Sequence, residues 1–178
     1  MTTQYYVAAS LDGFIADTDN SIEWLLQFGF EEFTPHYEKF LSGVGALVMG
    51  ASTYEFLLAE GSPWGYGETP TWVLTHRELP AMEGGDIRFM AGDVAQVHAQ
   101  AVAAAGEKAV WLIGGGEVVA QFAEAGLVDE LWVTIMPIVL GGGTPVLPVT
   151  GSPLNLELIE TTRFEPSGAT ELRYRVKR

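Results

Sequence analysis

Apolar and polar positions form their most informative pattern around residues 107–124. Residues 109–113 are an unbroken apolar run with the length and composition of a fully buried strand. Three glycines follow at 114–116, and Val118, Val119 and Phe122 then recur at helical spacing. The pattern predicts a strand, a glycine turn and a helix. Glycines allow close backbone approach, and the free N–H groups of a helix start favour a phosphate. The alternative is a tight turn that binds no ligand.

A second junction of this kind is predicted earlier in the chain. Residues 46–49 form a short buried strand that ends at Gly50, and either Ser52 or Thr53 can cap a helix that continues to residue 58. The start of this helix is a second candidate anion site. The sequence contains no P-loop, and the three consecutive glycines lack the spacing of a Rossmann fingerprint.

The other predicted elements follow from the same periodicities. In chain order they are a strand over 4–9, an irregular loop over 10–21, a helix over 31–41, strands over 71–75 and 87–90, a helix over 94–104, a long strand over 129–139, and a closing antiparallel hairpin of strands 154–161 and 170–176. Pro137 lies inside the long strand, which favours an edge or a bulge there. The glycine- and proline-rich loop 60–70 carries Trp64 and Tyr66, which either form a substrate lid or pack onto the core.

The order of these elements predicts the fold class. Strands alternate with helices up to about residue 125, and strands then continue alone. This order is typical of an α/β protein, here a three-layer αβα sandwich with a mixed central sheet whose last strands are antiparallel. With 178 residues, no repeat and no linker, the chain is expected to form a single domain.

Composition narrows the possible partners. The formal net charge of −14 disfavours nucleic acids and anionic membranes. No apolar stretch is long enough to span a membrane and no signal-peptide pattern is present, so we expect a cytoplasmic protein. There are no cysteines, and the three histidines lack metal-ligand spacing, so no metal site is predicted.

Four short segments, taken together and in order, resemble a known family. They are SLDGFIA at 10–16, VMG with TYE between 48 and 55, IGGGE at 113–117 and PIVLGGGTP at 137–145. The chain is similar to stand-alone homologues of the reductase domain of the bifunctional riboflavin-biosynthesis deaminase–reductase, a group that shares the dihydrofolate reductase fold. The resemblance implies an NADPH-dependent reductase similar to 5-amino-6-(5-phosphoribosylamino)uracil reductase or dihydrofolate reductase, acting on a small carbonyl, imine or pterin-like compound.

The resemblance also implies roles for individual positions. The implied cofactor contacts are Ala8, Ala9, Ile15, Gly50, Ser52, Thr53, Thr75, His76, Arg77, Ile113, Gly114, Gly115, Gly116, Glu117 and Val118. Ala8 and Ala9 would line the nicotinamide, and Ile15 would cover it. Residues 50–53 and 114–118 would meet the pyrophosphate from two sides, residues 75–77 would lie near the 2′-phosphate, and Thr134 would lie in the substrate pocket. The family often has Arg directly after the glycine that corresponds to Gly50, where this chain has Ala51.

Reduction of a C=N or C=O bond also needs a proton. Asp12, Glu31 and Glu32 are the candidate donors, and each has a structural alternative as a turn former or a solvated carboxylate. No catalytic residue is therefore assigned. In this fold the first half of the chain builds most of the substrate side, and residues 1–76 hold one basic residue, Lys39, against ten carboxylates. We therefore expect neutral or cationic substrates to be preferred over phosphorylated ones.

The assembly and two other function classes complete these expectations. Because related proteins commonly pair and the apolar run 131–140 needs cover, a homodimer is predicted. One alternative to a reductase is a nucleotide-binding dimer of the same fold without turnover, and the other is a structural dimer module without a ligand.

Overall fold

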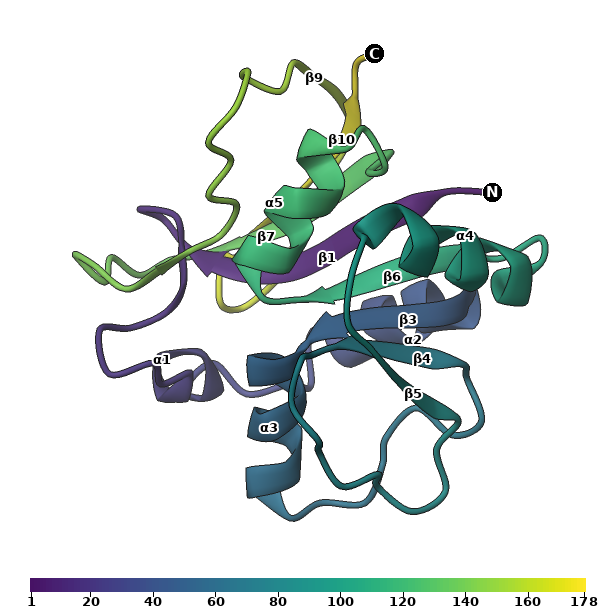
Figure 1. Ribbon diagram of the computed structural model, residues 1–178. Coiled ribbons are helices and arrows are strands. Elements are labelled where there is room, and N and C mark those ends of the chain that lie inside the picture. Colours follow the sequence, from purple (N-terminus) through teal and green to yellow (C-terminus); the bar gives the residue numbers. More distant parts are fainter.

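The structure is a computed structural model that describes residues 1–178. An eight-stranded sheet runs through the molecule in the order β5-β4-β3-β6-β1-β7-β10-β9, and a separate pair is formed by β2 and β8 (Figure 1). The strands are β1 (Thr3–Ser10), β2 (Phe14–Ala16), β3 (Val44–Gly50), β4 (Thr71–Leu74), β5 (Ile87–Met90), β6 (Ala109–Gly114), β7 (Glu130–Met136), β8 (Thr144–Pro145), β9 (Leu156–Arg163) and β10 (Thr170–Val176). The helices are α1 (Glu23–Leu26), α2 (Thr34–Ser42), α3 (Ala51–Glu60), α4 (Val94–Ala105) and α5 (Gly116–Glu124).

The sheet is mixed, as predicted. All pairs from β5 across to β7 are parallel, whereas β10 is antiparallel to both β7 and β9. Parallel strands need crossover connections, which contain helices except between β4 and β5, where residues 75–86 form a loop, while a hairpin is enough for the last antiparallel pair. No helix is both long and apolar enough to cross a bilayer.

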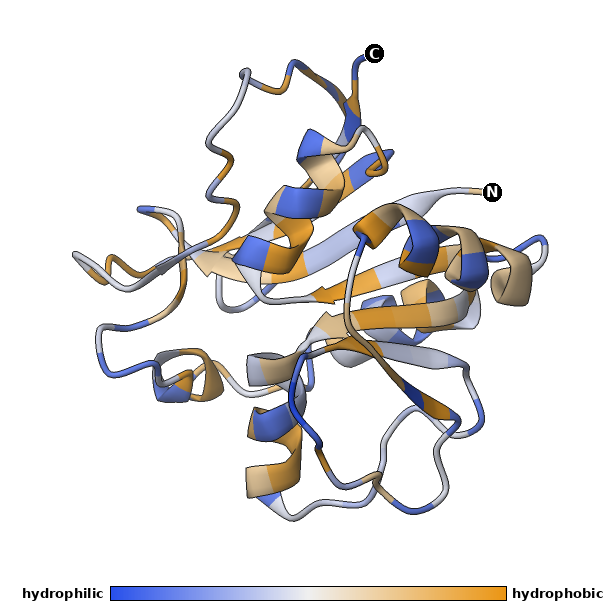
Figure 2. Ribbon diagram, viewed as in Figure 1, coloured by the Kyte–Doolittle hydropathy of each residue, from blue (hydrophilic) through white to orange (hydrophobic).

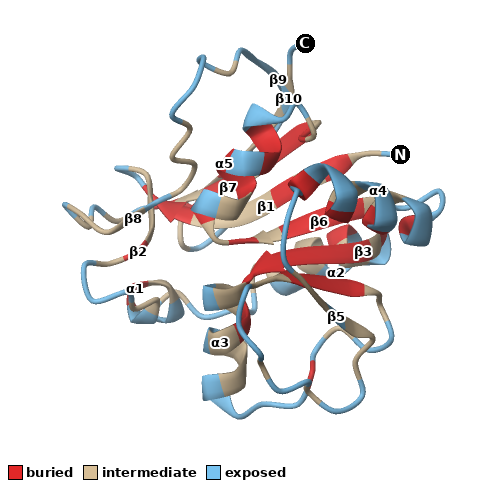
Figure 3. Ribbon diagram, in the orientation of Figure 1, coloured by how far each residue is buried: buried red, intermediate tan, exposed pale blue.

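Two apolar clusters on opposite faces make the three layers. On one face, residues of α4 and α5 such as Val97 and Phe122 pack with Val48 and Leu112. On the other face, α2 and α3 contribute one cluster that includes Tyr54. Alternate side chains of β3 and β6 enter opposite clusters, so these two strands are apolar along most of their length, and Figures 2 and 3 show them as largely apolar and buried.

Three local predictions are wrong or incomplete. The long strand ends at Met136, so Pro137 lies after it, and β7 is an inner strand between β1 and β10. Gly50, without a side-chain hydrogen bond, is the N-cap of α3, and neither Ser52 nor Thr53 caps the helix. Within the loop predicted over 10–21, β2 pairs with β8. A two-residue partner far along the chain gives no periodic signal, which is why this pair escapes a sequence pattern.

The aromatic loop between α3 and β4 packs onto the core. Trp64 is 9% exposed and donates its Nε1–H to the carbonyl oxygen of Gly67 at 3.1 Å. Tyr66 lies edge-on to the rings of Trp64 and Trp111, with centroid distances of 5.0 and 5.8 Å. These contacts support packing, rather than a lid, as the role of the two aromatic residues.

Candidate active site

A cavity of about 680 Å³ opens where the parallel strands β3 and β6 end side by side. Helix α3 starts directly after β3 with Gly50 as N-cap, and α5 starts after β6 with Gly115 as N-cap. No side chain caps either helix, so their first N–H groups are free to bind a ligand. Because α3 and α5 pack on opposite faces of the sheet, the positive ends of two helix dipoles reach this large cavity from two sides.

At this edge of the sheet, glycine occupies positions 50, 114 and 115 for different structural reasons. A Cβ on Gly50 would lie 2.8 Å from Cγ2 of Val118, so this glycine allows α5 to pack closely against the end of β3. Gly114 has φ +151°, which disfavours any other residue, and its peptide bond to Gly115 is cis. Gly115 itself has φ −75°, and a Cβ there would meet no atom within 4 Å. Gly115 therefore leaves open space in the cavity rather than relieving backbone strain.

Eleven of the fifteen implied cofactor residues line the large cavity. They are Ala8, Ile15, Gly50, Ser52, Thr53, Ile113, Gly114, Gly115, Gly116, Glu117 and Val118. Glu117 is the one charged residue of the lining, which contains no Lys or Arg. Any anion held there would therefore depend on backbone N–H groups.

The other four implied residues lie outside that lining. Ala9 is completely buried, because its side chain leaves the opposite face of β1 from Ala8. Thr75, His76 and Arg77 follow β4, the next strand beyond β3. The Arg77 guanidinium binds both carboxylate oxygens of Glu55 on α3, at 2.7 and 2.9 Å.

A second cavity of about 350 Å³ adjoins the first. Tyr6, Ala8 and Leu25 line both cavities, so the two meet at the middle of β1 beside α1. Thr134 lines this small cavity, as the resemblance implies for the substrate pocket. Tyr6 and Leu25 were not among the predicted site residues, because an aromatic residue in a buried strand and a leucine in a one-turn helix look like ordinary core positions.

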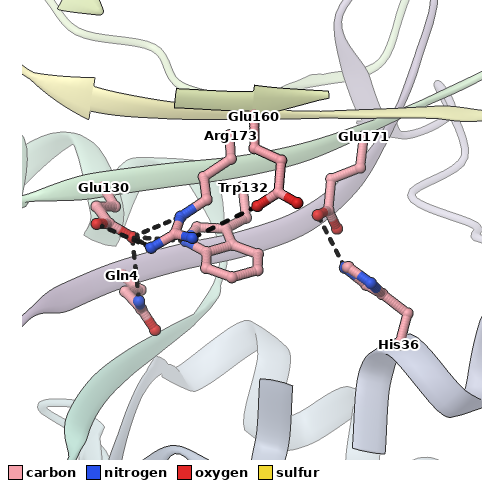
Figure 4. A network of polar contacts seen from close by, with 7 residues as sticks. All are labelled: Gln4, His36, Glu130, Trp132, Glu160, Glu171 and Arg173. Carbon is pink, nitrogen blue, oxygen red and sulfur yellow. Dashed lines mark hydrogen bonds and ion pairs between the residues drawn. The ribbon is translucent and has the colours of Figure 1, made fainter. Parts of the chain in front are cut away.

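A polar row crosses the sheet behind the small cavity. Ala8 on β1 is the register partner of Thr134 on β7, which is in turn the partner of Glu171 on β10. The Thr134 hydroxyl donates to Oε2 of Glu171 at 3.5 Å, and Nε2 of His36 on α2 lies 2.8 Å from Oε1 (Figure 4). Burial raises the pKa of the Glu171 carboxyl more than His36 and Thr134 lower it. This buried carboxyl contacts Thr134, which lines the small cavity.

The alternation of side chains along β10 makes Glu171 look like a solvent-exposed residue in the sequence. Along β10 it shares a face with Arg173 and Arg175, a pattern typical of a solvated strand face. The Glu171 side chain is nevertheless only 3% exposed, since α2 brings His36 over it. Arg173 lies further along the same face, with its guanidinium 4.2 Å from the Trp132 ring and ion pairs to Glu130 and Glu160 at 3.0 and 3.6 Å (Figure 4).

None of the three candidate proton donors lines either cavity. The Asp12 carboxylate accepts hydrogen bonds from the Ser10 hydroxyl at 2.7 Å and from the backbone N–H groups of Leu140 and Gly141 at 3.0 and 2.7 Å. These bonds lower the pKa of Asp12 to about 2, which suits a structural anion. Glu32 accepts from the backbone N–H of Ser167 at 3.3 Å, and Glu31 is exposed. The geometry favours the structural alternative for all three.

Comparison with known proteins agrees with this architecture. The uncharacterized protein YwjB of Bacillus subtilis is 30% identical over 172 residues, covering 97% of this chain and 96% of its own. A Shewanella sp. PV-4 protein assigned provisionally to riboflavin biosynthesis superposes with a TM-score of 0.86 at 27% identity, over all of both chains. Dihydrofolate reductase from Enterococcus faecalis, complexed with NADP(H) and RAB-propyl, shares the fold, with a TM-score of 0.65 at 18% identity over 99% of this chain and 97% of that one. The family model for the RibD C-terminal domain matches residues 59–168, and with these similarities the chain belongs to that reductase-related family.

Proposed function

We propose that this protein is an NADPH-dependent reductase that transfers a hydride to a small carbonyl, imine or pterin-like substrate. The observation that carries the proposal is the pair of joined cavities. The larger lies between two uncapped helix N-termini, and the smaller meets it at Tyr6, Ala8 and Leu25. A dinucleotide and a small acceptor need this kind of arrangement, because their reacting carbons must come together with water excluded.

The residues of the large cavity fit the cofactor. The pyrophosphate would accept hydrogen bonds from the first N–H groups of α3 and α5, in the space that the bare Gly115 leaves open. The nicotinamide would lie against Ala8 and beneath Ile15. When bound, NADPH would supply a hydride to the carbon of the C=O or C=N bond, whose oxygen or nitrogen then takes a proton.

The adenosine end of the cofactor would extend toward residues 75–77. Arg77 pairs with Glu55 at the surface, where the two side chains are 59% and 38% exposed. Exposed ion pairs of this kind contribute little to stability. A 2′-phosphate can therefore replace Glu55 as the partner of the Arg77 guanidinium with little loss of folding stability. Arg can donate two parallel hydrogen bonds to a phosphate.

Thermal unfolding with NADPH and with NADH tests the cofactor assignment. A ligand that binds only the folded state must raise Tm, and we expect NADPH to raise it more than NADH. Gly115→Val places a side chain in open cavity space at a residue whose φ of −75° does not require glycine. We expect this variant to keep the unliganded Tm within a few degrees and to lose most of the NADPH-dependent increase. An unchanged increase in the folded variant would remove the pyrophosphate site.

A dinucleotide-binding protein without turnover is the second candidate function. It is favoured by one observation, that Asp12, Glu31 and Glu32 all lie outside both cavities. Oxidation of NADPH with a panel of carbonyl compounds, aminouracils and pterins separates the two functions. Cofactor binding without oxidation of NADPH by any acceptor would support this second function.

A further inference from the structure

The small cavity has an apolar and aromatic wall. Of its ten lining residues, six lie between Leu25 and Tyr37, and none of the ten carries a charge. The polar side-chain atoms of the wall belong to Thr34, Thr134 and two tyrosines. The volume of about 350 Å³ is at the lower end of the range for small-molecule pockets.

The surroundings of this cavity disfavour an anionic ligand. Residues 23–38, which build most of the wall, contain four Glu and no Lys or Arg. On the sheet behind the wall, Arg173 is already paired with Glu130 and Glu160, and His36 is paired with Glu171. A phosphate placed here would lose its hydration without gaining a cation from the wall in return, since Lys39 on α2 does not line the cavity.

The polar atoms of the wall are too few for a ligand with many hydrogen-bonding groups. A pterin or an aminouracil presents donors and acceptors around most of its ring edge. Each of these groups that is buried without a partner lowers the binding affinity. An apolar ring, in contrast, gains free energy from contact with side chains such as Phe33 and Met136.

We propose that the small cavity binds an uncharged substrate with an apolar ring or chain, and that its one reducible polar group, a ketone or an imine, lies at Thr134. This inference rests on the proposed function for the reaction, but the binding chemistry belongs to the cavity itself. Thr134 is the register partner of Ala8, and Ala8 lines both cavities. A carbonyl that accepts a hydrogen bond from Thr134 therefore has its carbon at the place where the two cavities meet.

The Thr134 hydroxyl can donate to a ligand carbonyl while it accepts a hydrogen bond from Glu171. The Thr134 hydroxyl is 3.5 Å from the Glu171 carboxyl, close to the limit of a hydrogen bond. It can turn from this weak bond toward a ligand, and a protonated Glu171 could then donate to the hydroxyl oxygen. Burial raises the pKa of Glu171 and so favours its protonated form. His36 lowers this pKa, and the neighbouring Glu160 raises it.

Direct binding of four probes tests the proposal with and without saturating NADP⁺. The probes are 1-tetralone, its hydrocarbon analogue tetralin, 5-amino-6-ribitylaminouracil and the 5′-phosphate of that aminouracil. We expect 1-tetralone to bind several-fold more tightly than tetralin and at least tenfold more tightly than either aminouracil. Tighter binding of the phosphate ester than of 1-tetralone, or no binding of 1-tetralone by folded protein, would overturn the proposal.

Three variants locate the binding site. Thr134→Val should lower the affinity for 1-tetralone about three- to tenfold and leave that for tetralin unchanged, because one hydrogen bond is lost. Phe30 is 62% exposed at the rim, so Phe30→Asp should fold and should weaken binding of both compounds. Val139→Asp is the matched control, since Val139 is 63% exposed and lines neither cavity.

The outcomes separate this inference from the proposed function. If NADP⁺ leaves Tm unchanged while 1-tetralone binds and Phe30→Asp weakens it, the reductase assignment fails and the apolar site stands. If NADP⁺ binds but 1-tetralone does not, the cofactor site stands and the substrate class is wrong. Should Thr134→Val fail to fold, Phe30→Asp and its control still decide whether the small cavity is the site.

Discussion

Asp12 ties the end of β1 to the loop that follows β7, through hydrogen bonds from Leu140 and Gly141. The hydrogen bond from the Ser10 hydroxyl, together with these two backbone bonds, holds the folded pKa of Asp12 at about 2, below the roughly 3.9 of an unfolded Asp. A depressed pKa stabilises the fold above the unfolded value, and that stability is lost as the pH falls from about 4 through about 2. We expect Asp12→Asn to lower Tm at pH 7 and to flatten its decline over this window. Asp19→Asn, in the next turn, is the control, and equal acid sensitivity of wild type and Asp12→Asn would contradict the expectation.

Arg77 is expected to determine the preference of the protein for NADPH over NADH. If its guanidinium leaves Glu55 to bind the 2′-phosphate, Arg77→Ala should lower the affinity for NADPH about tenfold or more and that for NADH little. Titration calorimetry with both cofactors measures the difference. Glu55→Gln is the matched variant, since freeing Arg77 from its partner should raise the affinity for NADPH. Equal losses for both cofactors in Arg77→Ala would show that Arg77 does not bind the 2′-phosphate.

Among the elements, helix α5 combines two opposing electrostatic effects at its start. Glu117 lies in the first turn, where a carboxylate stabilises the helix dipole, but it also lines the cavity proposed for the pyrophosphate. We expect Glu117→Gln to lower Tm slightly and to raise the affinity for NADPH about two- to fivefold, as repulsion is removed. The gain in affinity should shrink as salt is added, because the residue is exposed. A loss of affinity would indicate that Glu117 accepts a hydrogen bond from the cofactor.

Elements with their own periodicity could be predicted from the sequence, and contacts between distant segments could not. Both glycine junctions are visible locally, because each consists of an apolar run, a glycine and a helical pattern in consecutive residues. The small cavity depends on α1, a single turn, and on α2 lying over β10, neither of which leaves a periodic trace. Glu171 illustrates the limit, since a strand places it on a polar face and only tertiary packing buries it. The predicted donors were carboxylates near the right segments, but hydrogen bonds hold Asp12 and Glu32 to loops, and Glu31 is exposed.

At the scale of the whole molecule, β9 is one of the two edge strands of the sheet. The homodimer was predicted from the apolar run 131–140, but its strand part, β7, lies inside the sheet, so that reason no longer holds. The edge strand β9 does carry exposed apolar side chains, among them Leu158 at 52% and Ile159 at 37% exposed. An edge strand with exposed apolar side chains tends to pair with another chain unless charges protect it, and the Glu157 and Glu160 carboxylates of β9 are already paired with Arg175 and Arg173 of the same chain.

We therefore expect two copies of the chain to associate through β9. A two-fold axis would place the same strand of both copies side by side, in a self-complementary contact. Leu158→Asp should yield a monomer by light scattering at micromolar concentration, because two charges would be buried opposite each other across the axis. The control Leu11→Asp alters a residue that is 66% exposed at the far end of β1, and it should leave the mass unchanged. Because both cavities are built within one chain, the monomeric variant should keep its NADPH-dependent increase in Tm. A monomeric wild type would remove the dimer, and loss of cofactor binding in monomeric Leu158→Asp would mean that the partner completes the site.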